Sequence, residues 1–124
     1  MSNIIYASIT LVHAGRTIPL SVLVNRSFHS LALNEAWQAE LKLPVIAAKE
    51  VKLSNGEVQF CNIAGPLTVS CLGREISCNV LILPGDTPPY LGSGPLLELG
   101  LLVDAEKMEV VVDNTPSPGG KIYL

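Results

Sequence analysis

The sequence predicts a mostly β domain with one or two short helices. Runs rich in Val, Leu and Ile recur between short turns that contain Gly, Asn or Pro, which is typical of strands joined in hairpins. One of these turns is Asn55-Gly56, the strongest short-range hairpin signal. The 124 residues suit a single domain, residues 1–124, and only 15% of them are charged, which favours a sheet with at least one buried face.

Two strands and a helix are expected in the first part of the chain. The segments Asn3–Val12 and Thr17–Val24 have strand composition and are joined by a turn that contains Gly15. A short apolar run then leads to a helix at Asn34–Lys42, for which Asn34 is a suitable N-cap.

The rest of the chain is predicted to form hairpins, with a rigid loop and a short helix between them. The expected elements are a hairpin at Ala48–Ile63, a hairpin at Pro66–Leu83 turning at Gly73-Arg74, a loop at Pro84–Gly94, a helix at Pro95–Gly100, two strands within Leu101–Asn114, a loop at Thr115–Gly120 and a strand at Lys121–Leu124.

Charge and composition exclude several classes of partner. The net charge is −3 and the sequence contains neither a basic stripe nor base-stacking aromatic clusters, so a nucleic-acid partner is not expected. The first residues lack the basic start and the long apolar run of a signal peptide. No segment reaches the roughly 18 apolar residues of a membrane span. We therefore expect a cytoplasmic protein with no membrane partner.

The cysteines and histidines do not predict a metal or cofactor site. Cys61, Cys71 and Cys78 show no Cys-x-x-Cys spacing, and His13 and His29 add no zinc-binding pattern. Free cysteines in a reducing compartment behave as small apolar residues. We expect three free thiols and no cofactor.

A motif near the C-terminus resembles one found in a known family. The segment "YLGSGPLLELGLLVD", residues 90–104, is similar to "LLGxDxLxxLGLxVD" in the retropepsin-like aspartic proteases, which include the retroviral proteases and small bacterial relatives. The order of hairpins, strand, polar turn and helix along the chain is also similar. The matching residues are Leu91, Gly92, Leu96, Leu99, Gly100, Leu101, Val103 and Asp104. The resemblance implies a closed antiparallel β barrel, with the Asn55-Gly56 hairpin as a flap over a cleft.

The turn after the second strand resembles the family's active-site turn but departs from it at its key positions. The bacterial relatives often read "VDTGFDGFLAL", whereas this chain reads "VNRSFHSLAL" from Val24. The resemblance places Asn25 at the catalytic Asp, Arg26 at Thr or Ser, and Ser27 at Gly. Gly94 likewise stands where the C-terminal motif has Asp.

These departures remove the chemistry that the family uses. In the family two chains pair, and each supplies one Asp to a shared site. Two close carboxylates share a single proton, so one takes a proton from water while the other donates to the scissile carbonyl. The neutral amide of Asn25 cannot act as a base near neutral pH. The loss of a general base costs on the order of 10²–10⁴ in rate. Three changed positions favour natural loss over a single laboratory substitution.

The sequence therefore leaves two functions open. The first is a catalytically inactive homodimeric peptide-binding or scaffold protein with a retropepsin-like fold. The second is a functional aspartic endopeptidase, whose base comes from elsewhere or which pairs with an intact homologue. We expect binding by residues of the turn, the flap and the C-terminal motif, namely Phe28, His29, Ser54, Asn55, Gly56, Leu91 and Gly92.

Simpler interpretations of the same residues also remain. Asn25-Arg26-Ser27 could be an ordinary turn in an unrelated β protein, and His29 could be a structural histidine. Ser27 and Ser30 flank His29 too closely in sequence for a third group to orient the histidine, which disfavours a Ser/His hydrolase.

Overall fold

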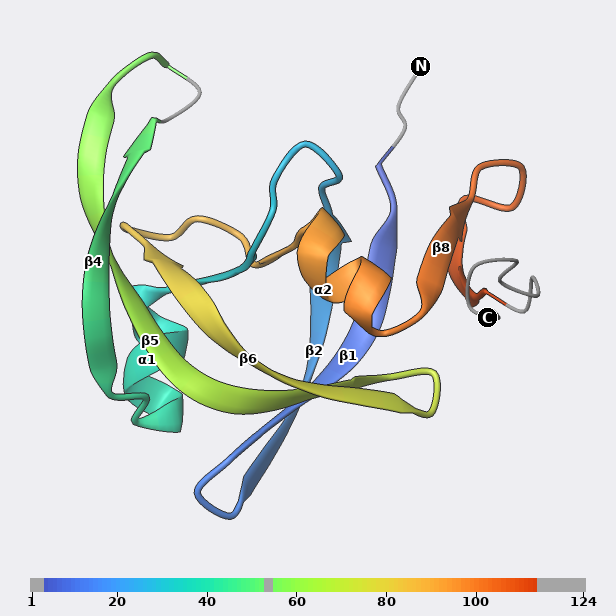
Figure 1. The fold of residues 1–124 in the computed structure, drawn as a ribbon, viewed down its shortest axis with the longest axis horizontal. Coiled ribbons are helices and arrows are strands. Elements are labelled where there is room, and N and C mark those ends of the chain that lie inside the picture. Colours follow the sequence, from blue (N-terminus) through green and yellow to red (C-terminus); the bar gives the residue numbers. More distant parts are fainter. Residues whose placement is uncertain (1–3, 53–54, 114–124) are drawn as a thin grey trace, which may run out of the picture.

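The computed structural model describes residues 4–52 and 55–113, and it shows a mostly β chain with two short helices, as predicted (Figure 1). The expected loop at Thr115–Gly120, the expected strand at Lys121–Leu124 and Ser54 lie outside the described residues. The elements are β1 Tyr6–His13, β2 Arg16–Val24, β3 Leu31–Asn34, α1 Glu35–Leu41, β4 Val45–Lys52, β5 Val58–Cys71, β6 Arg74–Leu83, β7 Tyr90–Leu91, α2 Ser93–Glu98, β8 Leu101–Asp104 and β9 Glu109–Val112.

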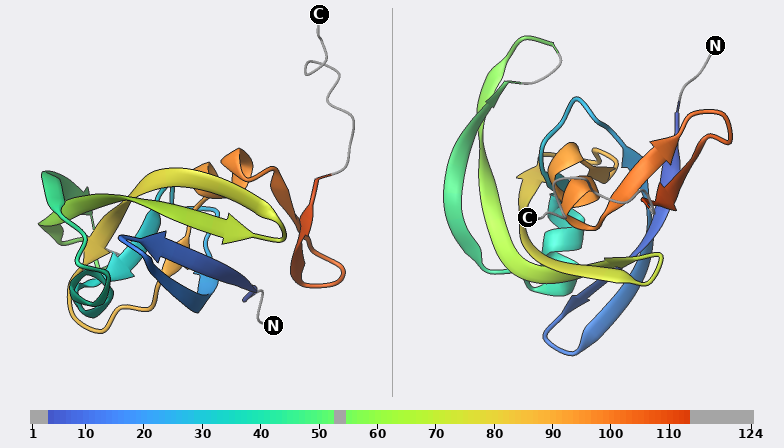
Figure 2. Two further views of the ribbon diagram at one scale, coloured as in Figure 1. Left: turned by 90° about the horizontal axis from the view of Figure 1, so that it is seen from below. Right: turned by 45° about the vertical axis from the view of Figure 1, so that its right-hand side comes forward.

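Six of the strands form a closed hydrogen-bonded ring. The order along the sheet is β1-β2-β7-β3-β6-β5-β4, and an additional pairing of β1 with β5 closes the ring and leaves β4 outside it. β8 and β9 form a separate two-stranded sheet. Figure 2 shows the β4–β5 hairpin projecting from the ring and curving over one side of the molecule.

Two strand pairings differ from the antiparallel barrel that the resemblance implies. β2 pairs with β7 and β3 pairs with β6 in the parallel direction. Parallel neighbours need a long connection between them. The chain supplies one in each case, since α1, β4 and β5 separate β3 from β6, and most of the domain separates β2 from β7.

The segment predicted as the rigid loop Pro84–Gly94 also contains regular structure. Tyr90 and Leu91 form β7, which lies between β2 and β3. α2 begins at Ser93, before the predicted start at Pro95. Two residues are too few for a recognisable strand pattern, so tertiary pairing alone defines β7.

Two hairpin turns have a left-handed backbone at both central residues. The φ angles are 50° and 81° for Ala14 and Gly15, and 51° and 80° for Leu72 and Gly73. Positive φ at both positions is the type I′ geometry, which fits the right-handed twist of the flanking strands. Cys71 therefore pairs with Arg74, and the predicted turn at Gly73-Arg74 is wrong by one residue.

One long strand serves both of the hairpins that were predicted separately. β5 pairs with β4 along its first half and with β6 along most of its length. Its register shifts between Ala64 and Leu67, which marks an irregularity in the strand. Gly65 lies there with φ of 132°, and a Cβ atom on it would lie 3.1 Å from the Cα of Asn79. Only glycine suits that position.

Helix α1 begins and ends as the sequence predicts. The side-chain oxygen of Asn34 accepts a hydrogen bond from the backbone N–H of Trp37 at 3.1 Å. Lys42 has a left-handed backbone and ends the helix just before Pro44. Leu41 is buried in the main core and Trp37 packs against that core, as expected for an i, i+4 apolar pair.

The core divides into two clusters on the two faces of β3. Leu31 and Leu33 belong to the main cluster, whereas Ala32 belongs to a smaller cluster beneath the β4–β5 hairpin. The apolar run before α1 is therefore a strand buried on both faces. Within the described residues, no helix is long and apolar enough to cross a membrane.

Candidate functional site

The polar turn after β2 is held by hydrogen bonds on both sides. The backbone N–H of Asn25 donates to the carbonyl of Leu91 at 3.0 Å, which continues the β2–β7 pairing. The side-chain oxygen of Asn25 accepts from the backbone N–H of Ser27 at 3.1 Å. The backbone N–H of Phe28 donates to the carbonyl of Asn25 at 3.1 Å and closes the turn. Asn25 thus fixes the shape of its own turn.

The start of α2 packs directly against the backbone of this turn. The N–H groups of Gly92, Ser93 and Gly94 donate to the carbonyls of Ser30, Phe28 and His29 at 3.0, 2.8 and 2.9 Å. A Cβ atom on Gly92 would lie 2.5 Å from the carbonyl oxygen of Phe28, closer than any side chain tolerates. The glycine of the C-terminal motif is needed because two backbone segments meet there.

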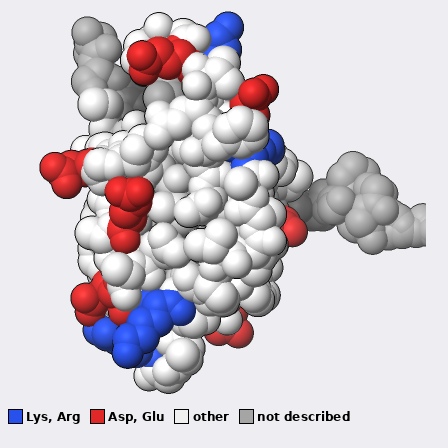
Figure 3. Space-filling model, turned by 90° about the vertical axis from the view of Figure 1, so that its left-hand side faces the viewer, with Lys and Arg blue, Asp and Glu red and all other residues white. Residues whose placement is uncertain are grey.

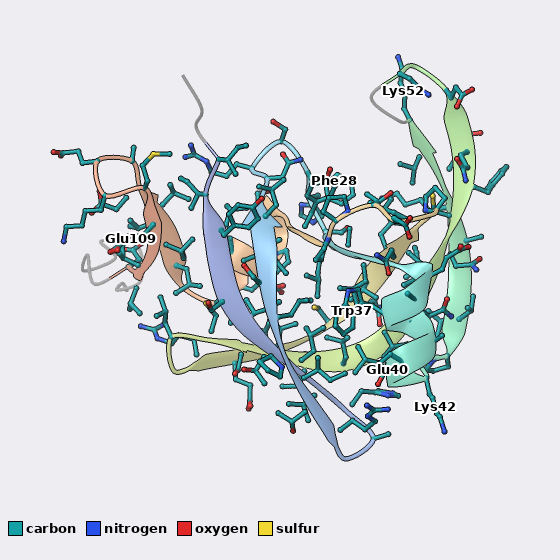
Figure 4. All side chains as sticks on the ribbon, turned by 180° about the vertical axis from the view of Figure 1, so that it is seen from behind. Phe28, Trp37, Glu40, Lys42, Lys52 and Glu109 are labelled. Atoms are coloured by element: carbon teal, nitrogen blue, oxygen red, sulfur yellow. The ribbon has the colours of Figure 1, made fainter. Side chains whose placement is uncertain are left out.

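A groove of about 330 Å³ lies between the turn, the β4–β5 hairpin and the loop after β6. Figure 4 labels Phe28 on the turn and Lys52 at the end of β4, near the tip of the β4–β5 hairpin; both residues border the groove. A smaller hollow of about 130 Å³ adjoins it and shares Phe28 and Val51 as lining residues. The groove is lined by Asn25, Phe28, Val51, Lys52, Asn55, Leu83, Pro84, Thr87 and Tyr90.

The structure brings together part of the predicted binding set. Asn25, Phe28 and Asn55 line the groove, and His29 lines the adjoining hollow. Leu91 is fully buried, so it supports the turn and is not accessible to a ligand.

Other predicted residues lie around the groove without lining it. Arg26 and Ser27 are exposed on the turn, and Gly56 is exposed near the tip of the β4–β5 hairpin. Gly92 lies beneath the turn, where its backbone contacts leave no space for a ligand. Neither Arg26 nor Ser27 lines the groove or the adjoining hollow.

The imidazole of His29 covers Gly94. A Cβ atom on Gly94 would lie 2.9 Å from the Cε1 atom of His29 and 3.1 Å from its Nε2 atom. A side chain at position 94 would therefore displace this ring. The resembled motif has Asp at position 94; in this chain the position is Gly94, and the ring of His29 occupies the space that a side chain there would need.

Several lining residues were missed by sequence reasoning. The rings of Phe28 and Tyr90 lie 5.9 Å apart at 53°, a tilted aromatic pair. Tyr90 directly precedes the Leu91-Gly92 motif, and this adjacency was an available signal. Leu83 is the last residue of β6, and Thr87 lies in the loop that follows, whose path the sequence does not predict.

The groove has no carboxylate that could act as a base. Glu50 is the only acidic residue that lines either hollow within the described parts of the chain. Glu50 pairs across strands with Phe60, which is 72% exposed, so the side chains of both lie on the outer face of the hairpin. No group of three His, Cys, Asp or Glu residues suited to a metal ion occurs in the described ranges.

The thiol of Cys61, beneath the β4–β5 hairpin, is expected to be unreactive near neutral pH. Cys61 is buried in the small cluster with Leu81 and Leu83. Burial raises the pKa of the Cys61 thiol above its usual value. The neutral thiol is therefore a packing group and not a nucleophile near neutral pH.

A second hollow, of about 400 Å³, is larger but carries less chemistry. It lies between β2 and α1 and is lined by Arg16, Ile18, Ala36, Trp37 and Glu40. Its two charged groups, Arg16 and Glu40, form an ion pair with each other. The groove beside Asn25 is lined by polar and aromatic side chains and by residues of β4, which has no strand partner on its outer edge among the described residues, and it is the stronger candidate.

The outer face of the β4–β5 hairpin is largely uncharged. Figure 3 looks onto this side of the molecule and shows a broad surface with charged side chains mainly at its margins. Val45, Ile46, Val58 and Phe60 are among the exposed apolar residues of β4 and β5.

Comparison with known proteins assigns no family. The chain matches no protein-family model and no curated protein sequence. Function must therefore be inferred from the residues of the site.

Proposed function

We propose that this protein is a catalytically inactive, homodimeric member of the retropepsin-like fold that binds extended peptides. The observation that carries the proposal is the position of Asn25, at a groove beside a flap hairpin, on a turn held by β7. The ring of strands, the flap hairpin and the motif at the start of α2 occur in the order that the resemblance implies.

The lack of a carboxylate among the described residues that line the groove supports the loss of aspartic-type catalysis. Asn25 uses its side-chain oxygen to accept from the N–H of Ser27, which leaves an amide NH₂ that can only donate. Water activation needs a group that accepts a proton in the transition state. Among the described residues, no acid lines the groove, and Glu50 is the only acid that lines the adjoining hollow.

A free strand edge supports peptide binding. β4, Val45–Lys52, is the last strand in the sheet order, so its outer edge has no strand partner among the described residues. Its residues Val51 and Lys52 line the groove. An extended peptide can add to such an edge through backbone hydrogen bonds, while pockets receive alternate side chains.

Exposed apolar residues support a homodimer. They come from the start of β1, from α2 and from the β8–β9 hairpin, which lie near one another in Figures 1 and 2. A second copy would cover apolar surface that is costly to leave in water. These residues are Ile4, Tyr6, Leu97, Leu102 and Met108.

Peptide cleavage and peptide binding test the proposal together. The native chain and a triple variant, Asn25→Asp with Arg26→Thr and Ser27→Gly, are incubated with an unfolded protein mixture from about pH 3 to about pH 8. Mass spectrometry then records any cleavage. Hydrogen exchange of the native chain with and without extended peptides records protection of the β4 amides.

We expect a silent native chain that binds peptides along β4, and a variant that cuts. Cleavage by the native chain would contradict the loss of catalysis and favour the endopeptidase alternative. If no peptide protects β4, the binding function is wrong even when the native chain is silent.

A further inference from the structure

We propose that the groove selects peptides in which a carboxylate side chain lies two residues from an apolar side chain. This inference rests on the proposed peptide-binding function and specifies its ligand class. It follows from the face on which the charged residues of β4 lie, from the free donor on Asn25, and from the apolar pocket between turn and flap.

Strand register places Lys49 on the groove side of the flap hairpin. Lys49 pairs across strands with Cys61, and cross-strand partners project to the same face. Cys61 is buried in the small cluster, and Val51 packs against that cluster two positions along β4. Because side chains alternate along a strand, Lys49 and Val51 share this inner face.

The nearest acid lies on the opposite face. Glu50 is adjacent to Lys49 in β4 and projects outward with its partner Phe60. Asp86 lies in the loop between Pro84 and Thr87 but does not itself line either hollow. Lys49 and Glu50 both border the adjoining hollow, but by strand register only the side chain of Lys49 projects to the inner face. No acidic residue among the described ones lines the groove itself, although the whole chain has a net charge of −3.

Asn25 adds a second donor to the groove. A backbone N–H can bind only an acceptor, so the atom facing Ser27 is the amide oxygen of Asn25. The NH₂ group of Asn25 is then directed away from the turn. Carbonyl and carboxylate oxygens are the groups that satisfy such donors, which favours acceptor-rich ligands.

The apolar part of the ligand has a defined place beside these donors. Phe28 and Tyr90 form an aromatic pair, and both pack with Val51 against the small cluster. Val51 and Lys49 lie about 7 Å apart along one face of β4 at the usual rise of a strand. A peptide strand added to β4 presents its own alternate side chains at the same spacing, so an acid and an apolar residue two positions apart match both sites.

Matched peptides test this preference. Three fluorescent eight-residue peptides share one sequence with a central leucine and carry glutamate, glutamine or lysine two residues from it. Fluorescence anisotropy measures the Kd of each for the native chain. The same measurements use Lys49→Gln and, as a matched control with the same charge change, Lys107→Gln in the β8–β9 turn, away from the groove.

We expect the glutamate peptide to bind about threefold to fivefold more tightly than the glutamine peptide, and the lysine peptide to bind most weakly, which is the scale of one exposed ion pair. Salt of about 0.3 M should reduce the difference, since it screens exposed charges. Lys49→Gln should abolish the difference, whereas Lys107→Gln should retain it.

The possible negative results distinguish failure of the acid preference from failure of the proposed peptide-binding function. If all three peptides bind with equal affinity, the acid preference is wrong while the peptide-binding function stands. If Lys49→Gln retains the preference for glutamate, the assignment to Lys49 is overturned. If none of the peptides binds, the inference and the proposed function fall together.

Discussion

The side-chain oxygen of Asn25 accepts a hydrogen bond from the backbone N–H of Ser27, 3.1 Å away. Asn25, which the resemblance places at a catalytic acid, therefore has a structural role in its own turn. An ionised Asp could accept the same bond, so the turn can keep its shape while the chemistry at position 25 changes.

Replacement of Asn25 should separate the structural role from the chemical one. Asn25→Ala removes the acceptor for the N–H of Ser27 and should lower the free energy of unfolding by about 0.5–1.5 kcal/mol. Asn25→Asp retains the acceptor and should unfold near the native urea midpoint. Urea unfolding followed by circular dichroism measures both, and equal loss in the two variants would contradict the role of the hydrogen bond.

Gly92→Ala should be strongly destabilising. The added methyl group would lie 2.5 Å from the carbonyl oxygen of Phe28 and 2.6 Å from the carbonyl carbon of His29, so two backbone segments must separate. We expect a loss of about 2 kcal/mol or more in the free energy of unfolding. Ser93→Ala, at the adjacent position, is the control and should cost much less. A native-like midpoint for Gly92→Ala would show that the two segments are not in tight contact.

Asn34 joins the start of α1 to the loop after β6. Its oxygen accepts from the N–H of Trp37, and its NH₂ group donates to the carbonyl of Thr87 at 3.1 Å. Asn34→Ala should cost about 1–2 kcal/mol of stability because both bonds are lost. Asn34→Asp keeps the cap but not the donor and should lie between the native chain and Asn34→Ala. Thermal and urea unfolding of the three proteins would reveal a different order if the loop contact did not matter.

The thiols predict a loss of stability in alkaline solution. Burial, together with the negative charge of Glu98, raises the pKa of Cys78 from 9.0 to about 11. The folded chain therefore keeps this proton when the unfolded chain has lost it. The stabilisation is fully present below about pH 9 and is lost as the pH rises toward 11.

Cys78→Ala isolates this effect. Between about pH 8 and pH 10.5 the native chain should lose more unfolding free energy than Cys78→Ala, because the variant lacks the linked proton. Parallel losses in the two proteins would contradict the raised pKa. Glu98→Gln should speed alkylation of Cys78 by iodoacetamide at a fixed alkaline pH, since it removes the charge that disfavours the thiolate.

Leu97 provides a test of the proposed dimer. Its side chain is 79% exposed on α2, whereas Leu72 is 55% exposed in the β5–β6 turn. Leu97→Glu should raise the dimer dissociation constant by about tenfold or more if Leu97 is buried between copies. Leu72→Glu introduces the same change elsewhere and should leave association unchanged. Sedimentation velocity at micromolar concentration distinguishes the two, and a monomeric native chain would contradict the homodimer.

The local elements were predictable because local chemistry defines them. The cap at Asn34 follows from the preference of an amide oxygen for free backbone N–H groups at a helix start. The turns at Gly15 and Asn55-Gly56 follow from residues that tolerate a left-handed backbone. The sequence also predicts the turn at Asn25, because this residue directly follows a segment of strand composition and precedes a short apolar run.

Tertiary structure alone decided the closure of the ring and the make-up of the groove. β7 has only two residues and exists because Tyr90 and Leu91 find partners on β2 and β3, a long-range pairing with no local pattern. The same pairing buries Leu91 and brings Tyr90 to Phe28. Leu91, a predicted binding residue, therefore supports the turn from within the core, whereas Tyr90, which was not predicted, lines the groove. The sequence by itself determined the chemistry that Asn25 lacks, because an amide is no base in any fold. Which side chains surround Asn25 depended on segments far apart in sequence, and their contacts form only when the chain folds.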